Sequence, residues 1–239
     1  MKKPLIGIVG KTFSLEIDTN VFWELTNINS HIRYSLIKNG ADVLGILPQS
    51  EALKFNDQDE PDFTKLTNED KTSLKRLLML CDGIVFQGGL SSASYEEYLA
   101  SLCYELDIPT LGICAGQSTM LRSINGSAKK HNNDKKHNQP ALEYVHKIFI
   151  NEKSNFYKIV KCKEMMVNSI HSYSPCDIKD YIVSAYDDDN NIEVVENPNK
   201  TFHLAMRFHP ELLVDKDEKM NSIFKAFVEA CKAKIKDNH

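Results

Sequence analysis

A cysteine flanked by glycines is the feature of the sequence that most clearly suggests chemistry. Gly112-Ile113-Cys114-Ala115-Gly116 follows a short apolar run and matches the nucleophile elbow, with cysteine in place of serine. In such an elbow a strand turns sharply into a helix, and small flanking residues leave room for the strained nucleophile. The helix N-terminus favours a thiolate. Taken alone, the motif fits a buried structural cysteine equally well.

A thiol nucleophile requires a base, and the base requires a group that orients it. Among the eight histidines His209 has the best context, because Pro210 stiffens the chain after it and Glu211 supplies a carboxylate two residues later. A surface histidine beside an exposed glutamate is the alternative, and it is the more common meaning of an isolated His-Pro-Glu tripeptide.

An oxyanion hole would complete such a site. We expect the backbone N–H of Ala115 to supply one donor and the backbone N–H of Gly88 or Gly89 to supply the other. Glycines at these positions let the backbone approach a substrate carbonyl closely.

The first half of the sequence predicts alternating strands and helices. Apolar runs indicate buried strands, apolar residues at helical spacing indicate helices, and Thr67–Asp70 and Ser94–Glu97 fit capping boxes. The expected strands are Leu5–Val9, Asp42–Leu47, Gly83–Phe86 and the run into Cys114, and the expected helices are Val21–Asn39, Thr67–Cys81 and Ser94–Leu106. The alternation predicts an α/β fold with a mostly parallel central sheet flanked by helices, in which ligands bind at the carboxyl ends of the strands. The Gly-Gly pair and Cys114 both lie at such ends.

The second half of the sequence has a different pattern. Additional antiparallel strands are expected at residues 144–150, 166–169, 181–186, 192–195 and 202–208, followed by an amphipathic helix that contains Ile223–Cys231. The polar residues 126–140 predict a solvated loop. We give little weight to metal binding by its histidines, His131 and His137, because no third ligand is nearby. With no linker or repeat, residues 1–239 are expected to form a single domain.

Composition and charge argue against several classes of protein. The 239 residues carry a net charge of −4, and no basic stripe is present that could bind nucleic acid. The apolar run after the initial Met-Lys-Lys-Pro is too short for a signal peptide, and no stretch is long enough to span a membrane. We therefore expect a cytoplasmic protein. The six cysteines form no C-x-x-C pair and no cluster with histidine, so neither disulfides nor a metal site are expected.

Four motifs occur in an order that resembles the class I glutamine amidotransferase family. They are DGIVFQGG at 82–89, GICAG at 112–116, VNSIH at 167–171 and FHPE at 208–211. The resemblance extends from Leu5 to Leu213, and the third motif is most similar to the γ-glutamyl-γ-aminobutyrate hydrolase branch. It implies a Cys114–His209–Glu211 triad that cleaves γ-glutamyl amides through a γ-glutamyl thioester. It implies no metal and no organic cofactor.

The sequence departs from the family pattern near the expected substrate. The family usually has glutamine four residues after the nucleophile, whereas here Gln117 comes three residues after it and Ser118 takes the fourth position. An acidic residue usually follows the Gly-Gly pair, where this chain has Leu-Ser-Ser at 90–92. We expect Gln117, Ser118, His171 and Ser172 to contact the substrate. For His171 a hydrogen-bonded structural role is an equal alternative.

Three functional hypotheses remain open at this point. The first is a stand-alone hydrolase of γ-glutamyl amides or glutamine, with a small-molecule substrate. The second is a glutaminase subunit that delivers ammonia to a separate synthase. The third is a non-catalytic binding protein that keeps the fold. Self-association into a homo-oligomer also remains open.

Overall fold

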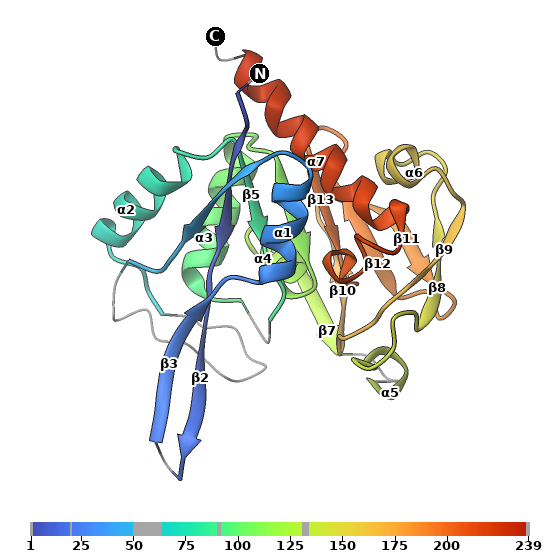
Figure 1. Ribbon diagram of the computed structural model, residues 1–239, viewed down its shortest axis with the longest axis horizontal. Coiled ribbons are helices and arrows are strands. Elements are labelled where there is room, and N and C mark those ends of the chain that lie inside the picture. Colours follow the sequence, from blue (N-terminus) through green and yellow to red (C-terminus); the bar gives the residue numbers. More distant parts are fainter. Residues whose placement is uncertain (1, 20, 50–63, 90–91, 131–133, 238–239) are drawn as a thin grey trace.

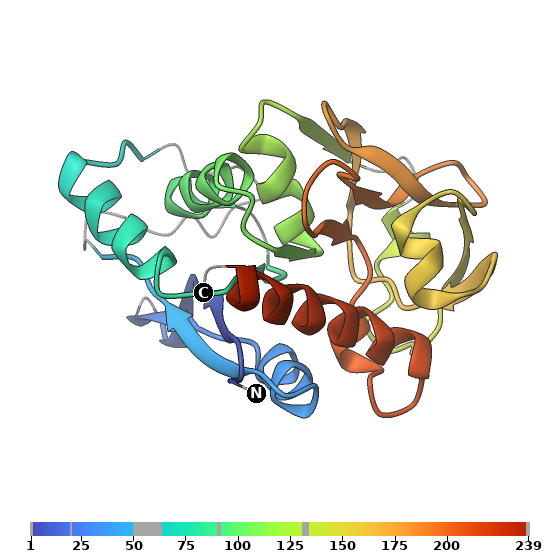
Figure 2. The ribbon, with the colours of Figure 1, turned by 90° about the horizontal axis from the view of Figure 1, so that it is seen from above.

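The computed structural model describes residues 2–19, 21–49, 64–89, 92–130 and 134–237. In this part of the chain a nine-stranded sheet passes through the molecule with helices on both of its faces (Figures 1 and 2). The strands follow the order β4 (Asp42–Ile46), β1 (Leu5–Val9), β5 (Gly83–Phe86), β6 (Thr110–Ile113), β13 (His203–Met206), β12 (Ile192–Glu196), β11 (Ile182–Asp187), β8 (His146–Ile150) and β9 (Glu164–Val167).

The sheet has a parallel half and an antiparallel half. Strands β4, β1, β5, β6 and β13 are parallel to one another, whereas β12, β11, β8 and β9 continue the sheet with antiparallel pairs. Every residue of β5 and β6 is buried, as expected for parallel strands that are covered on both faces. The predicted α/β architecture, with antiparallel strands in the second half of the chain, is confirmed. The strand expected at 202–208 differs in part, because β13 is parallel to β6 and antiparallel only to β12.

Helices pack on each face of the sheet over a separate apolar cluster (Figure 2). On one face lie α1 (Ser30–Lys38), α6 (Asn155–Val160) and α7 (Glu218–Asp237), and on the other lie α2 (Asn68–Leu78), α3 (Ser94–Glu105) and α4 (Ala115–Arg122). The first cluster contains Phe224 and Phe227 from α7, and the second contains Leu74 from α2 and Leu99 from α3. Full burial of each such side chain contributes roughly 1.5–3 kcal/mol.

The capping predictions have two different outcomes. The box of Thr67 and Asp70 is confirmed, because the Thr67 hydroxyl accepts from the Asp70 N–H and the Asp70 carboxylate accepts from the Thr67 N–H. The box predicted over Ser94–Glu97 is wrong by one residue. Helix α3 is capped at Ala93, whose N–H donates to the Glu96 carboxylate at 2.7 Å.

The helix predicted over Val21–Asn39 is also corrected. Residues Val21–Asn27 form β3, which pairs with β2 (Lys11–Asp18) in a hairpin that extends away from the body of the protein (Figure 1). Helix α1 begins only after Asn29, whose side chain accepts hydrogen bonds from two N–H groups of the first turn. The aromatic and β-branched residues at 21–23 favour a strand, and the Asn29 cap fixes where the helix starts.

The loop predicted over residues 126–140 contains regular structure. Strand β7 (Ser127–Lys130) pairs with β10 (Tyr173–Asp177), and α5 (Asp134–His137) is a single helical turn. The polarity of this segment reflects an exposed two-stranded ribbon, and the partner strand is too distant in sequence for a local pattern to indicate the pairing.

Gly116 provides a test of how tightly α4 packs against the sheet. A Cβ at this position would overlap the carbonyl oxygen of Phe86. We therefore expect Gly116→Ala to destabilise the protein by about 1–3 kcal/mol, although glycine to alanine in a helix normally stabilises by roughly 0.5–1 kcal/mol. Thermal unfolding measures the change. Gly45→Ala is the matched control, because its Cβ would lie 3.6 Å from Ile28, and equal melting temperatures for the two variants would contradict the packing.

Candidate active site

Three neighbouring parallel strands end at one place and bring the predicted reactive groups together. Gly88 and Gly89 follow β5, Cys114 follows β6, and His209 comes shortly after β13. The register is direct, because Phe86 pairs with Gly112 and the N–H of Cys114 donates to the Met206 carbonyl at 2.8 Å. The site therefore lies at the carboxyl ends of the strands, as predicted.

Cys114 has the strained backbone of a nucleophile elbow. Its φ of 54° and ψ of −112° lie in a region that non-glycine residues rarely adopt. The residue caps the N-terminus of α4, and its side chain is 6% exposed. Gly88 packs beside it, and a Cβ on Gly88 would lie 2.8 Å from the His209 ring and 3.3 Å from the Cys114 Cβ. The glycine is thus required for the close approach of these two side chains.

His209 is oriented by a buried carboxylate. Its Nδ1 lies 2.8 Å from Oε1 of Glu211, and Glu211 is 1% exposed within the short 3₁₀ turn η1 (Pro210–Leu212). The Nδ2 of Asn29 donates to the same oxygen at 3.4 Å. The carboxylate is therefore held between the imidazole and the first residue ahead of α1, which fixes the ring of His209 in place.

The backbone of His209 is also held from both sides by one side chain. The Oδ1 of Asn168 accepts from the His209 N–H at 2.7 Å, and the Nδ2 of Asn168 donates to the His209 carbonyl at 2.8 Å. Asn168 is 2% exposed and directly follows β9. It connects the catalytic histidine candidate to the outermost strand of the antiparallel half.

The electrostatic environment distinguishes Cys114 from the other buried cysteines. Burial alone would raise the pKa of Cys114, but the nearby charge of His209, a hydrogen bond from it and the charge of Arg207 together lower that pKa to about 6. Burial raises the pKa of Cys81 and Cys103 to about 12. Burial lowers the pKa of His209, but the nearby charges of Glu211 and Cys114 outweigh this effect and raise that pKa well above its usual value. A thiolate–imidazolium pair is the favoured state at neutral pH.

A cavity of about 210 Å³ opens next to the sulfur. Its described lining comprises Gly89, Ser92, Cys114, Ala115, Ser118, Arg122, Asn138, Ile170, His171, Ser172, Tyr173 and Arg207. Arg207 is 3% exposed, and its Nη1 donates to the Cys114 carbonyl and to the Ser118 hydroxyl, each at 2.9 Å. The Nη1 of Arg122 donates to the Ser92 hydroxyl at 2.9 Å. Two guanidinium groups thus make the cavity suited to an anionic ligand.

Of the four predicted substrate contacts, three line the cavity and one does not. Ser118, His171 and Ser172 line the cavity. Gln117 does not, because its side chain is fully buried and its Nε2 donates to the carbonyls of Glu193 and Ala205, each at 3.2 Å. The expectation that Gln117 contacts the substrate is therefore corrected. Leu90 and Ser91, which belong to the altered segment after the Gly-Gly pair, lie outside the described residues.

Several supporting residues were missed by sequence reasoning. Asn168 lies within the VNSIH motif, but its backbone contacts with His209 cross from one strand end to another. Arg207 immediately precedes the FHPE motif, which is a signal that could have drawn attention to it. Neither Arg122 nor Asn29 belongs to any recognisable motif, and only the fold brings them to the site.

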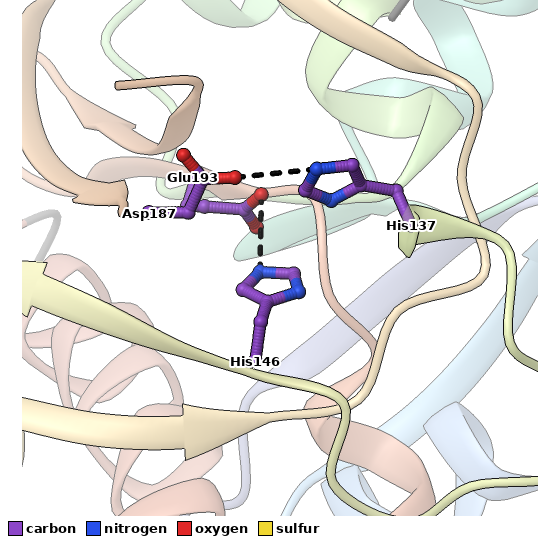
Figure 3. Close-up of side chains that lie close together, drawn as sticks. All are labelled: His137, His146, Asp187 and Glu193. Atoms are coloured by element: carbon purple, nitrogen blue, oxygen red, sulfur yellow. Dashed lines mark ion pairs between the residues drawn. The ribbon is translucent and has the colours of Figure 1, made fainter. Parts of the chain in front are cut away.

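A second group of side chains could hold a metal ion. His137, His146, Asp187 and Glu193, here named the His–carboxylate cluster, are all buried, and their possible ligand atoms lie within 4.8 Å of one another (Figure 3). The expectation that no third ligand lies near His137 is wrong, because three strands further along the chain, β8, β11 and β12, bring His146, Asp187 and Glu193 beside it. His131 lies outside the described residues.

The chain matches the Peptidase C26 family over residues 91–211, and it belongs to this family. A Rickettsia prowazekii protein provisionally named as glutamine amidotransferase-like is 26% identical, with 67% of this chain and 80% of that protein covered. The CTP synthase of Levilactobacillus brevis is 24% identical over 74% of this chain. The match covers 38% of that enzyme, so this chain spans well under half the length of the CTP synthase. The class I glutamine amidotransferase resemblance is confirmed at the level of the family.

Solved structures show the same fold at low sequence identity. A Thermoplasma acidophilum protein, provisionally described as one of the subunits of a GMP synthase, superposes with a TM-score of 0.67 at 16% identity, with 100% of this chain and 98% of that chain covered. The glutaminase domain of Trypanosoma brucei CTP synthase, solved with bound acivicin, gives 0.66 at 18% identity, with 96% and 94% covered. Within the described residues no helix has the length and apolar character needed to cross a membrane.

The lowered thiol pKa gives a labelling prediction. At pH 7 and limiting iodoacetamide, Cys114 should react before the other five cysteines, because its thiolate dominates above about pH 6. Its labelling rate should stay nearly constant from pH 8 to pH 7 and fall as the pH drops below about 6, where the sulfur becomes protonated. Peptide mass spectrometry measures each site. Exposed Cys176 is the internal control, and faster labelling there would remove the electrostatic argument for Cys114.

Proposed function

We propose that this protein is a cysteine-dependent hydrolase of γ-glutamyl amides, in the manner of the γ-glutamyl-γ-aminobutyrate hydrolases. The observation that carries the proposal is the strained Cys114, whose pKa is lowered to about 6 beside His209 and which opens onto a cavity with two arginines. The membership of the Peptidase C26 family supports it. We assign the catalytic roles to Cys114, His209 and Glu211.

In the first half of the reaction the Cys114 thiolate attacks the γ-carbonyl carbon of the substrate. The resulting oxyanion is stabilised by the N–H of Ala115, at the start of α4, and by an N–H from Gly88 or Gly89. The His209 imidazolium then donates its proton to the leaving amine as the carbon–nitrogen bond breaks. The products of this step are a γ-glutamyl thioester and the free amine.

In the second half a water molecule replaces the amine. Neutral His209 removes a proton from the water as it attacks the thioester carbonyl, and the collapse of the second oxyanion expels the Cys114 thiolate. Glutamate is released and the thiolate–imidazolium pair is restored. Glu211 holds Nδ1 of His209 at 2.8 Å through both halves, so that Nε2 is the nitrogen that exchanges the proton.

The charges in the cavity favour an anionic substrate. Arg122 and Arg207 both line it, whereas its described lining contains no carboxylate side chain. A γ-glutamyl group carries one carboxylate at its α-carbon, and γ-glutamyl-γ-aminobutyrate carries a second on the amine. One guanidinium can serve each carboxylate, which supports an anionic leaving amine over ammonia.

A glutaminase subunit that supplies ammonia to a separate synthase is the second candidate. It is favoured by the similarity to CTP synthases, and by the fold shared with a GMP synthase component and with a CTP synthase glutaminase domain. The triad chemistry would be the same in this case. The two candidates differ in the leaving group and in whether a partner protein raises the rate.

A substrate panel distinguishes these functions. We expect the purified chain to hydrolyse γ-glutamyl-γ-aminobutyrate with a higher kcat/KM than glutamine, because glutamine lacks the second carboxylate. Glutamate release is measured by a coupled assay, with Cys114→Ala as the blank. A clear preference for glutamine would favour the ammonia-supplying role. Turnover of neither substrate would favour the non-catalytic protein.

The role of Arg122 gives a separate prediction. Arg122→Gln should lower kcat/KM for γ-glutamyl-γ-aminobutyrate by about 10–100-fold, since a hydrogen bond to a charged group contributes roughly 1.5–3 kcal/mol. The loss should appear mainly in KM, because the side chain is assigned to binding. Arg33→Gln is the matched control, as Arg33 is exposed on α1. Equal losses for both variants, or no loss for Arg122→Gln, would contradict the assignment.

A further inference from the structure

The His–carboxylate cluster lies within the antiparallel half of the sheet, and the proposed hydrolysis does not use it. His137 ends α5, His146 begins β8, Asp187 ends β11 and Glu193 lies in β12. Each side chain is at most 4% exposed. Figure 3 shows the two imidazoles and the two carboxylates pointing toward one another across a small space.

The spacing of the cluster corresponds to that of metal ligands. The Nε2 of His137 lies 3.3 Å from Oδ2 of Asp187, and the Nε2 of His146 lies 3.4 Å from Oε1 of Glu193. In a tetrahedral zinc site with bonds of about 2.0–2.1 Å, neighbouring ligand atoms are separated by about 3.3–3.4 Å. Both nitrogen–oxygen pairs therefore already have the separation of two ligands on one ion.

The hydrogen bonding of the cluster is incomplete in a way that an ion would satisfy. Both carboxylate oxygens of Glu193 and both ring nitrogens of His146 are buried, and none of them makes a hydrogen bond to the described part of the chain. The Nε2 of His146 and Oε1 of Glu193 are 3.4 Å apart, which is long for a direct hydrogen bond. Buried polar atoms normally have partners, and a bound cation would supply one to Glu193 and His146 at once.

Asp187 is held in the orientation that a ligand needs. Its Oδ1 accepts from the N–H groups of Asp189 and Asn191 at 2.9 and 2.8 Å, and its Oδ2 accepts from Nδ2 of Asn191 at 2.9 Å. Such second contacts fix the direction of a ligating carboxylate. The turn between β11 and β12 is therefore shaped around this side chain.

The donor set indicates the class of ion. Two imidazole nitrogens and two carboxylate oxygens suit a divalent ion of the zinc class, whereas magnesium and calcium prefer oxygen ligands throughout. We propose that the His–carboxylate cluster binds one zinc-class divalent ion in a closed structural site. Four ligands from the protein complete a tetrahedral sphere, so the ion stabilises the fold and leaves no open position for a substrate.

The position of the site gives the ion a role next to the cavity. His171 lines the cavity, and its Nε2 lies 3.5 Å from Oε1 of Glu193. Asn138, which follows the ligand His137, also lines the cavity. The N–H of His171 donates to the His137 carbonyl at 3.2 Å. A bound ion would therefore fix the cavity wall formed by Asn138, Ile170 and His171, at a distance from the reacting sulfur.

The test uses the Cys114→Ala chain, which removes the low-pKa thiolate as a competing zinc ligand and makes every readout independent of hydrolysis. After treatment with a chelator, the chain is titrated with Zn²⁺, dialysed and analysed by mass spectrometry of the metal content. We expect one zinc ion per chain and a higher melting temperature with zinc. Replacement by Co²⁺ should give the intense visible absorption of a tetrahedral site.

A second variant and a second measurement identify the ligands. Glu193→Gln in the same background should lower the zinc affinity at least about 100-fold. Glu152→Gln is the matched control, because Glu152 is an exposed carboxylate that belongs to neither group of possible metal ligands in the described residues, and it should bind as the parent does. X-ray absorption of the zinc-loaded parent should show imidazole and oxygen ligands without sulfur, and it applies even where Glu193→Gln does not fold. Zinc content at trace level, sulfur ligation, or a folded Glu193→Gln with unchanged affinity would overturn the proposal.

Discussion

The backbone of Cys114, with φ at 54°, is a conformation that a non-glycine residue keeps only when its surroundings fix it. Its N–H donates to the carbonyl of Met206 and its carbonyl accepts from the side chain of Arg207. Gly116, two residues later, lies against the backbone of Phe86. Two neighbouring strands therefore hold the turn from opposite sides. The Cys114 sulfur is positioned by the parallel half of the sheet, and the strain is retained because that half is closely packed.

The charged groups around the Cys114 sulfur also depend on one another. Burial opposes the charged form of both Cys114 and His209, yet each side chain is charged because the other is, and Glu211 adds its own charge from behind the imidazole. Arg207, which directly follows β13, adds positive charge. A buried group of this kind is favourable only as a complete set, since the removal of one member leaves the others without compensation. This is why neither a cysteine motif nor a His-Pro-Glu tripeptide is informative alone.

Local sequence patterns predict those features of the fold and the site that depend on residues close together in the chain. The buried strands, the glycine-flanked turn at Cys114 and the pair of His209 and Glu211 each involve short spacings in the sequence. Hydrophobic periodicity does not indicate which segments pair with one another. It therefore misses the hairpin β2–β3, the pairing of β7 with β10 and the contact of Asn29 with Glu211. A local pattern also gives His137 little weight as a metal ligand, because its neighbours in the cluster come from strands further along the chain.

Glu193 shows how the two halves of the sheet are connected, and it gives a reason for one departure from the family pattern. Its backbone carbonyl accepts from Nε2 of Gln117 and from the N–H of Arg207, while its side chain belongs to the His–carboxylate cluster. Gln117, three residues after Cys114, points into the core and donates hydrogen bonds to carbonyls of β12 and β13. Ser118, four residues after Cys114, faces the cavity instead. The antiparallel half therefore contributes to the elbow through Glu193, while the segment 170–173, which comes after β9, lines the cavity. Changes near that segment can alter the cavity while the strand ends keep Cys114 and His209 in place.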